Sequence, residues 1–259
     1  MPPLTSETQT KTQSEPDAID RIAPTRRPSG PVVMRQRWLD LLFLHWSVPA
    51  EPLQRLLPPE LTLDTFEGRA YIGLVPFTMR GVRPAFLPAI PALSNFAEIN
   101  VRTYVHQAGQ NPGVWFFSLD AANAVAVKIA RAAFKLPYHY AKMEVAENNG
   151  EIHYESRRLW PEPIPANCEI RYAPTGKICP AAPGTLEHFL AERYILYSHA
   201  NGNLYRGRVH HAPYPLQTAA VSQLDENLIS AAGILRPDAA PLVHFAREVD
   251  VRIYRLERV

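Results

Sequence analysis

The sequence is poor in cysteine and lacks the segments that carry a protein into or across a membrane. Only two of its 259 residues are cysteines, Cys168 and Cys179. Two thiols are too few for a disulfide framework, and their spacing fits no zinc site. No apolar run approaches the roughly 18 residues of a membrane-spanning helix, and the first 30 residues lack the apolar core of a signal peptide. We therefore expect a cytoplasmic protein with free thiols and no membrane partner.

Clustered positive charge and the standard catalytic motifs are also absent. The net charge is +2, with both signs interspersed, whereas a nucleic-acid partner needs a clustered basic face. The chain contains no G-x-G-x-x-G, Walker, H-E-x-x-H or G-x-S-x-G motif. The adjacent histidines His210 and His211 point to opposite faces of a strand, so they are poorly placed to share one metal ion. We expect no nucleic acid, no metal and no cofactor.

Proline, by contrast, is abundant. The 26 prolines are about double the average usage, and they mark turns, strand ends and edges. Residues 1–30 are rich in Thr, Ser, Gln, Pro and charge, which predicts a disordered tail before a single domain at 31–259. The stretch "RPAFLPAIPALSN" (83–95) predicts a loop with exposed Phe86, Leu87 and Ile90. We expect this loop to cover either a pocket or an interface in a homo-oligomer.

Alternating segments separated by turn signals dominate the rest of the chain. Turns at Glu67-Gly68, at 107–113 and at Asn149-Gly150 predict three hairpins, in the first of which residues 61–66 pair with 69–79. Several short strands with few helices predict an α+β fold. We expect an antiparallel, closed or strongly curved sheet with a few peripheral helices.

Two helices are predicted from apolar periodicity. The first begins at Ala122 with Asp120 as its N-cap, and it ends before Pro137. The second covers 184–194. Its apolar stripe places Arg193 on the core-facing side, where an arginine either lines a wet cavity or extends its charged end to water.

Polar residues on one predicted strand are candidates for a site. Glu98 and Arg102 are four residues apart on the same face, and their alternation with Ile99 and Val101 predicts a half-buried strand. Glu98 and Arg102 form either a cavity pair or a solvent-facing pair of little energetic value. In a cavity, Glu98 would act as an acid or base and Arg102 would hold an anionic group. His45 ends an apolar strand and is interpreted as a core aromatic residue.

The lysines of "AAFKLPYHYAKM" (132–143) are either nucleophiles or surface charges. Lys135 continues a basic stripe formed with Lys128 and Arg131, which is typical of a solvated helix face. Lys142 lies on a predicted strand with no evident titratable neighbour. The pattern favours surface charges for both lysines.

Several blocks of the chain, taken together, resemble one bacterial family. The blocks are "QRWLDLLFLHW", "LPPELTLDTFEGRAYIGLVPFTMRGVRP", "FAEINVRTYV", "GVWFFSLDA", "LPYHYAKM", "FLAERYILY" and "HAPYPLQTA". They are similar to the YqjF-like proteins, a family of unknown function, over roughly residues 31 to 256. That family is grouped by fold with acetoacetate decarboxylase. The resemblance implies a cone-like antiparallel β-barrel with surrounding helices and an internal pocket.

The resemblance also implies where catalytic residues would lie and what is missing. The decarboxylase carries a Schiff-base lysine pair in a "PKK" stretch after a helix. Here "LPYHYA" places Tyr138 and His139 after the matching Pro137, and neither side chain supplies an amine. The "FAE" stretch resembles the family's "Y-x-E", so Glu98 corresponds to its pocket glutamate.

We therefore expect a pocket that binds a small organic acid or carbonyl compound without a Schiff base. The expected lining residues are Glu98, Arg102, Tyr138, His139, Arg193 and His211. Glu98 or His139 would move a proton while Tyr138 donates to an oxyanion. Arg102 or Arg193 would neutralise a carboxylate. The alternative is a non-catalytic sensor or carrier with the same pocket.

Overall fold

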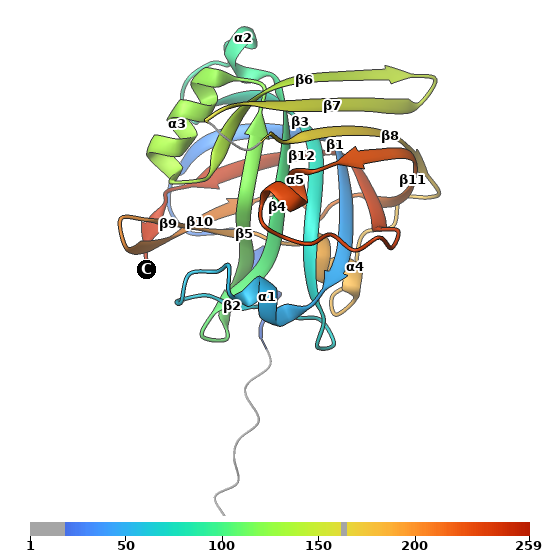
Figure 1. Ribbon diagram of the computed structural model, residues 1–259. Helices are drawn as coiled ribbons and strands as arrows, with labels where there is room; N and C mark the ends of the chain where they lie inside the picture. Colours follow the sequence, from blue (N-terminus) through green and yellow to red (C-terminus); the bar gives the residue numbers. More distant parts are fainter. Residues whose placement is uncertain (1–18, 162–164) are drawn as a thin grey trace, which may run out of the picture.

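The computed structural model describes residues 19–161 and 165–259 (Figure 1). In these residues the strands all belong to one hydrogen-bonded sheet: β1 (Val32–Val48), β2 (Thr62–Leu63), β3 (Ala70–Pro84), β4 (Phe96–Gln107), β5 (Gln110–Ala121), β6 (Tyr138–Asn148), β7 (Glu151–Trp160), β8 (Asn167–Thr175), β9 (Ile195–Ala200), β10 (Asn203–His210), β11 (Leu216–Glu226), β12 (Leu242–Tyr254) and β13 (Glu257–Arg258). The helices are short: η1 (Ala23–Thr25), α1 (Ala50–Gln54), α2 (Pro91–Ser94), α3 (Ala124–Phe134), α4 (Leu186–Ala191) and α5 (Leu228–Ala231). None of these helices is long and apolar enough to cross a membrane.

The strand pairings return on themselves. Strands β5, β4, β3, β1 and β12 pair in that order, and β12 also pairs with β10, which leads through β9 back to β5. A second route from β5 to β12 runs through β6, β7, β8 and β11. Most pairings are antiparallel, as predicted, but β5 pairs in parallel with both β6 and β9. The fold is therefore mostly β with few helices, and its sheet is mixed rather than wholly antiparallel.

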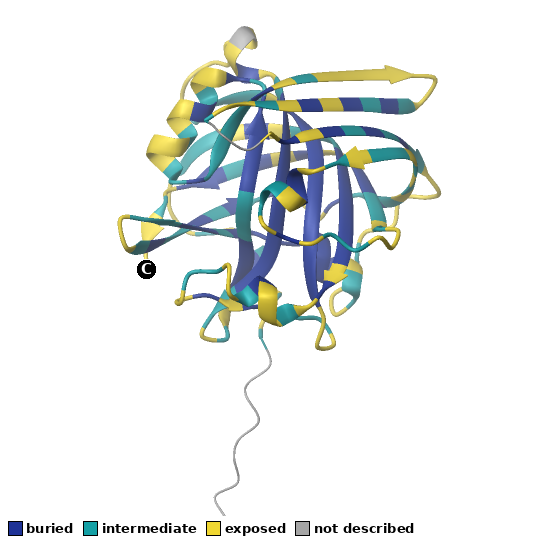
Figure 2. Ribbon diagram, viewed as in Figure 1, coloured by how far each residue is buried: buried dark blue, intermediate teal, exposed yellow. Residues whose placement is uncertain are grey.

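The central strands are buried on both faces (Figure 2). On β1, Leu42 and Leu44 pack into a core with β7 and β8, whereas Leu41 and Phe43 pack toward α4 and β10. The alternation of β4 therefore does not mark a half-buried strand, because Glu98 is as buried as Ile99. Two buried faces also explain the unbroken apolar run of β1, since every residue along it needs a non-polar neighbour.

The first predicted hairpin pairs differently. Phe66 and Arg69 form an isolated bridge across the Glu67-Gly68 turn, but β2 pairs with β4 rather than with β3. At the third hairpin, Asn149 and Gly150 have φ angles of 52° and 84°. These left-handed values are the ones that a tight two-residue hairpin turn requires.

Helix α3 begins two residues later than predicted. Its N-cap is Asn123, whose side chain accepts hydrogen bonds from the backbone N–H groups of Val125 and Ala126. Asp120 instead lies within β5 and forms an ion pair with Arg158. Asp and Asn are both good N-cap residues. Asn123 takes this role because it follows the end of β5, whereas Asp120 still lies within the strand.

The folded part of the chain begins earlier than predicted. Residues 1–18 of the predicted tail lie outside the described residues, but 19–30 are described and include η1, and Arg21 contacts the body of the protein. Asp20 accepts hydrogen bonds from the first N–H groups of η1, and Arg21 pairs with the fully buried Asp64. Arg21 also lies 5.2 Å from the centre of the Phe189 ring. The ion pair and the ring contact hold this segment in place.

Candidate functional site

A cavity of about 610 Å³ borders the face of β1, β3 and β4 that is directed toward β9 and β10. This volume lies within the range of small-molecule sites. Most of its lining side chains are aliphatic or aromatic. The buried polar residues that border it are Gln36, Ser94, Glu98, Asn100, Arg102, Asn123 and Arg193. A largely apolar pocket with a few placed polar groups is typical of a ligand site.

Glu98 and Tyr138 form a hydrogen-bonded pair in the cavity wall. Glu98 lies on β4, and the Tyr138 hydroxyl, at the start of β6, donates to its Oε2 at 2.8 Å. Burial raises the pKa of Glu98 to about 8; the Tyr138 hydrogen bond opposes the rise and the nearby Asp120 adds to it. Burial and the neighbouring Glu98 raise the pKa of Tyr138 well above its ordinary value. At neutral pH the site therefore contains a neutral carboxylic acid held by a phenol.

Arg102 is a buried cation that forms no salt bridge with a described residue. Its Nη2 donates to the Leu190 carbonyl at 3.1 Å, and its Nε has no hydrogen-bond partner in the described chain. The guanidinium lies 5.5 Å from the centre of the Phe43 ring. Arg102 is four residues from Glu98 along β4, a backbone distance of about 13 Å. The two side chains have separate partners, so the cavity ion pair considered above does not form.

Tyr104 and His45 form a hydrogen-bonded chain that ends on the same Leu190 carbonyl as Arg102. Tyr104 donates its hydroxyl proton to the Leu190 carbonyl at 2.7 Å and therefore accepts from His45 Nε2 at 2.6 Å. Burial, together with the charge of Arg102, lowers the pKa of His45 well below its ordinary value, so the ring is neutral. A Cβ on Gly73 would lie 3.1 Å from the His45 ring and 3.3 Å from Arg102 Cγ. Glycine at this position makes room for both side chains.

Arg193 also borders the cavity, but its charge has a partner. Helix α4 ends at Ala191, so Arg193 follows the helix rather than ending its stripe. Its Nη1 binds Asp64 Oδ2 at 2.7 Å, its Nε donates to the Phe189 carbonyl, and its Nη2 has no partner in the described chain. Burial lowers the pKa of Arg193, and Asp64 opposes that change. Arg193 thus shares the Asp64 carboxylate with Arg21, whereas Arg102 has no carboxylate partner in the described chain.

The two predicted histidines do not line the cavity. His139 follows Tyr138 on β6 and points to the opposite face, where its Nδ1 lies 3.4 Å from Asp120 Oδ1. His211 stacks on Tyr194 at a centroid distance of 4.4 Å, and its Nδ1 donates to a backbone carbonyl. Burial lowers the pKa of each histidine to about 4, so both are neutral at pH 7. The structure brings together four of the six predicted residues: Glu98, Arg102, Tyr138 and Arg193.

Both lysines of the 132–143 stretch lie outside the cavity. Lys135 ends α3 in the left-handed conformation, and its Nζ donates to the Ala132 carbonyl at 2.7 Å. Lys142 is exposed and pairs with Glu144 at 3.0 Å. Neither amine borders the pocket.

Three polar residues at the cavity were missed by the sequence reasoning. Asn100 Oδ1, Gln36 Oε1 and Trp38 Nε1 are buried without a hydrogen-bond partner in the described chain, and all three residues border the cavity. Asn100 lies between Glu98 and Arg102 on the same face of β4, so the alternation that marked its neighbours also marks it. Nothing in the sequence distinguishes Gln36 and Trp38 from other residues of β1. Unpaired buried polar atoms in a cavity are available to a ligand.

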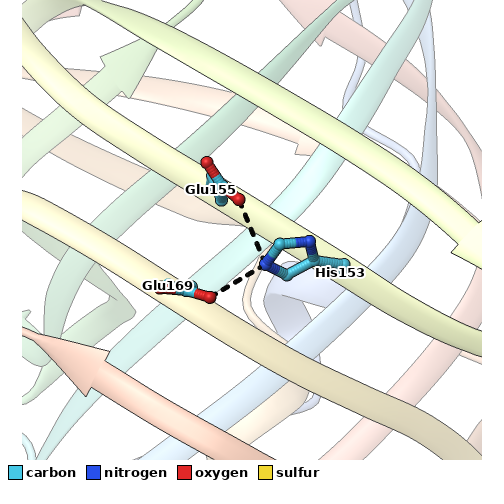
Figure 3. A group of neighbouring side chains, drawn as sticks. All are labelled: His153, Glu155 and Glu169. Carbon is cyan, nitrogen blue, oxygen red and sulfur yellow. Dashed lines mark hydrogen bonds and ion pairs between the residues drawn. The ribbon is translucent and has the colours of Figure 1, made fainter.

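A separate cluster of titratable groups lies away from the cavity, on β7 and β8. Figure 3 shows His153 between Glu155 and Glu169, with Nε2 at 3.2 and 3.1 Å from their carboxylate oxygens. The potential ligand atoms of the three residues lie within 4.8 Å of one another. No local pattern indicates this cluster, because Glu169 comes from a neighbouring strand. That the protein binds no metal stays a prediction.

Solved structures with this arrangement of strands include acetoacetate decarboxylases and related enzymes. The acetoacetate decarboxylase of Legionella pneumophila aligns with a TM-score of 0.60 at 12% identity, over 96% of this chain and 98% of that chain. The enduracididine biosynthesis enzyme MppR, solved in complex with pyruvate, aligns with a TM-score of 0.59 at 12% identity, over 89% and 91%. The protein therefore has an acetoacetate decarboxylase-like fold.

Sequence comparison then gives the family. The DUF2071 profile, described as "Uncharacterized conserved protein", matches residues 35–250. The "Uncharacterized protein YqjF" of Bacillus subtilis (strain 168) is 39% identical over 231 residues, which are 89% of this chain and 94% of that protein. The chain belongs to the DUF2071 family, and its resemblance to the YqjF-like proteins is confirmed.

Proposed function

We propose that the cavity binds a small organic acid or carbonyl compound and promotes a proton transfer on it without a covalent intermediate. The observation that carries the proposal is Arg102, a buried guanidinium at the cavity with no carboxylate bound to it in the described chain. Buried charges are normally paired, because an unpaired one costs several kcal/mol (roughly 3–5 where a partner is removed). A ligand carboxylate would supply the missing counter-ion and form charge-assisted hydrogen bonds.

Glu98 is the proposed proton donor. Its carboxyl group is protonated at neutral pH, and Tyr138 binds only one of its oxygens. The other oxygen would give its proton to an enolate oxygen of the ligand, so that the enolate becomes an enol and Glu98 becomes a carboxylate. The resulting carboxylate keeps the Tyr138 hydrogen bond, which stabilises the charge. A pKa near the working pH is the value that suits a general acid.

Tyr138 stands where the resemblance places the lysine of a Schiff-base enzyme, so we propose that covalent amine chemistry is missing from this chain. In this proposal the returning strand pairings form a cone-like barrel around the cavity. The MppR structure with pyruvate supports an oxo acid as the ligand class, because pyruvate combines a carboxylate with a carbonyl. The carboxylate would bind Arg102, and because Glu98 is about 13 Å along β4 from Arg102, the ligand oxygen that receives its proton would lie several bonds from the carboxylate.

The test is ligand binding and turnover in two variants. Native mass spectrometry of freshly purified protein would detect a retained ligand, and calorimetry with pyruvate and acetoacetate would measure affinity. Arg102→Gln should weaken binding about 10-fold or more, as expected for a lost charge-assisted contact, whereas Arg83→Gln at the cavity mouth should not. Glu98→Gln should keep binding and lose turnover. Unchanged affinity in Arg102→Gln would contradict the proposal.

A non-catalytic carrier is the second candidate. The mostly apolar lining of the cavity favours it, since such a surface holds a ligand without acting on it. A retained ligand together with no turnover of oxo acids in the wild type would favour the carrier over the enzyme.

A further inference from the structure

We propose that the ligand is amphipathic, with a carboxylate at Arg102 and an apolar tail that leaves the cavity between the 84–94 segment and α3. This inference rests on the proposed function, because it assumes that Arg102 binds the carboxylate. It adds the chemical class of the ligand: a medium-chain or long-chain acid in place of a short one.

The mouth of the cavity is formed by large apolar side chains that remain in contact with water. Leu87 and Ile90, from the 84–94 segment, are 55% and 58% exposed, and Val125 and Ile129 of α3 are 50% and 55% exposed. We call these four residues the apolar rim, and all four border the cavity. Single exposed apolar residues are common, but a group of them around an opening marks a binding surface.

The two sides of the apolar rim are joined. The Asn123 side chain, which caps α3, donates to the Leu93 carbonyl of α2 at 2.9 Å. Helices α2 and α3 lie at the same end of the molecule (Figure 1). The rim is therefore a built part of the site, and its apolar groups have a fixed position relative to the cavity.

Apart from the polar groups described above, the cavity between the apolar rim and Arg102 is lined mainly by aliphatic and aromatic residues: Met34, Val75, Phe77, Met79, Val82, Phe96, Leu119, Phe134 and Leu136. The other cationic residue near the mouth, Arg83, is only partly buried, so water can solvate its charge, whereas the guanidinium of Arg102 is buried. A charged head is therefore best placed at Arg102, with the tail directed outward.

The cavity volume supports the same orientation. A short acid such as pyruvate would leave most of the 610 Å³ empty, and it would not reach the apolar rim. An alkyl chain would fill the space between Arg102 and the rim and cover rim side chains that are otherwise exposed. Each buried methylene would then add affinity.

The test is a chain-length series. Affinity is measured for straight-chain carboxylates of about four to about twelve carbons, and each added methylene should tighten binding roughly fourfold, equivalent to about 0.8 kcal/mol. Leu87→Ser and Ile129→Ser should weaken the long acids and leave the short ones unchanged. Val145→Ser is the matched control, because Val145 is an exposed apolar residue of β6 that does not border the cavity.

The Arg102 variant and the rim variants distinguish a failure of this inference from a failure of the proposed function. Arg102→Gln should weaken acids of every length by a similar factor. If it does so but affinity is the same from short to long acids, the amphipathic ligand is wrong and the carboxylate site stands. If Arg102→Gln changes nothing at any length, both fail. If the rim variants alter the oligomeric state and no affinity, the apolar rim belongs to a subunit contact and the inference is overturned.

Discussion

The two faces of strand β4 form two different regions of the molecule. On one face Ile99 and Val101 pack into an apolar core against β7 and β8. On the other face Glu98, Asn100 and Arg102 border a cavity, and two of the three have polar atoms without a partner in the described chain. Residues one position apart therefore serve different purposes. A strand that is buried on both faces can therefore contribute to the packed core with one set of side chains and to a ligand site with the alternate set.

Two carboxylates show the same contrast. Asp120 lies directly across from Ile99, on the packed face, and Arg158 binds both of its oxygens at 2.9–3.1 Å. Burial raises the pKa of Asp120 to about 6, and the Arg158 hydrogen bonds oppose the rise, so the acid is ionised at pH 7. Glu98 has only the Tyr138 phenol and is neutral at that pH. The carboxylate on the packed face is neutralised by an ion pair, whereas the carboxyl group on the cavity face is neutral because it is protonated.

Removing these acids should give the largest difference between the faces. Asp120→Asn leaves the Arg158 guanidinium, whose side chain is 6% exposed, without its counter-ion. We expect a loss of about 3–5 kcal/mol in the free energy of unfolding at pH 7. Glu98→Gln should instead raise it by about 3 kcal/mol, because at pH 7 the wild type has to protonate a carboxyl group that is ionised in the unfolded chain, and glutamine does not. Urea unfolding of both variants measures this, and equal losses would contradict the comparison.

Truncating leucines on β1 should give the next largest difference. Leu44 is fully buried in the packed core, so Leu44→Ala should cost about 2–5 kcal/mol of unfolding free energy. Leu41 borders the cavity, and Leu41→Ala should cost at least about 1 kcal/mol less, because fewer neighbours lose contact. Urea unfolding measures both losses, provided that the dependence of the unfolding free energy on urea concentration is the same in the two variants. A larger loss in Leu41→Ala would show that the cavity face carries the stability.

The protonation of Glu98 should make stability depend on pH. Its folded pKa of about 8 lies above the ordinary value of 4.5, so proton binding favours the folded state. This contribution is complete below about pH 4.5 and is lost as the pH rises toward 8. Relative to Glu98→Gln, the wild type should lose about 2 kcal/mol between about pH 5 and about pH 7. Unfolding titrations of the two proteins at several pH values measure this, and a constant difference would show that Glu98 is ionised throughout.

The sequence predicted the parts of the site that follow from local periodicity. Glu98 and Arg102 lie on one face of β4 because side chains alternate along a strand. Tyr138 was predicted as a site residue from the family resemblance. The same alternation places His139 on the opposite face from Tyr138, and the prediction of both as lining residues overlooked it.

Long-range pairing accounts for what the sequence did not predict. The parallel pairing of β5 with β9 joins segments that are far apart in the chain, and no local pattern encodes it, whereas β5 and β6 are consecutive strands connected by α3. Likewise, the partner of Arg193 is Asp64, more than a hundred residues away. The turn of the third hairpin, by contrast, is set by the adjacent residues Asn149 and Gly150, and it was predicted at the correct position, whereas the second turn, predicted at 107–113, is confined to the two residues between β4 and β5.

The smallest effects are expected at the lysines, which extend the comparison from the cavity to the protein surface. Lys142→Met removes an exposed pair with Glu144, and Lys135→Met removes one hydrogen bond to a backbone carbonyl. Each should change the unfolding free energy by less than about 1 kcal/mol and leave oxo-acid affinity unchanged. Borohydride reduction of the wild type with an oxo acid should leave no adduct on either residue, as measured by mass spectrometry of peptides. A stoichiometric adduct on one of them would mean that an amine reaches the ligand, and the non-covalent chemistry proposed for Glu98 and Tyr138 would then be wrong.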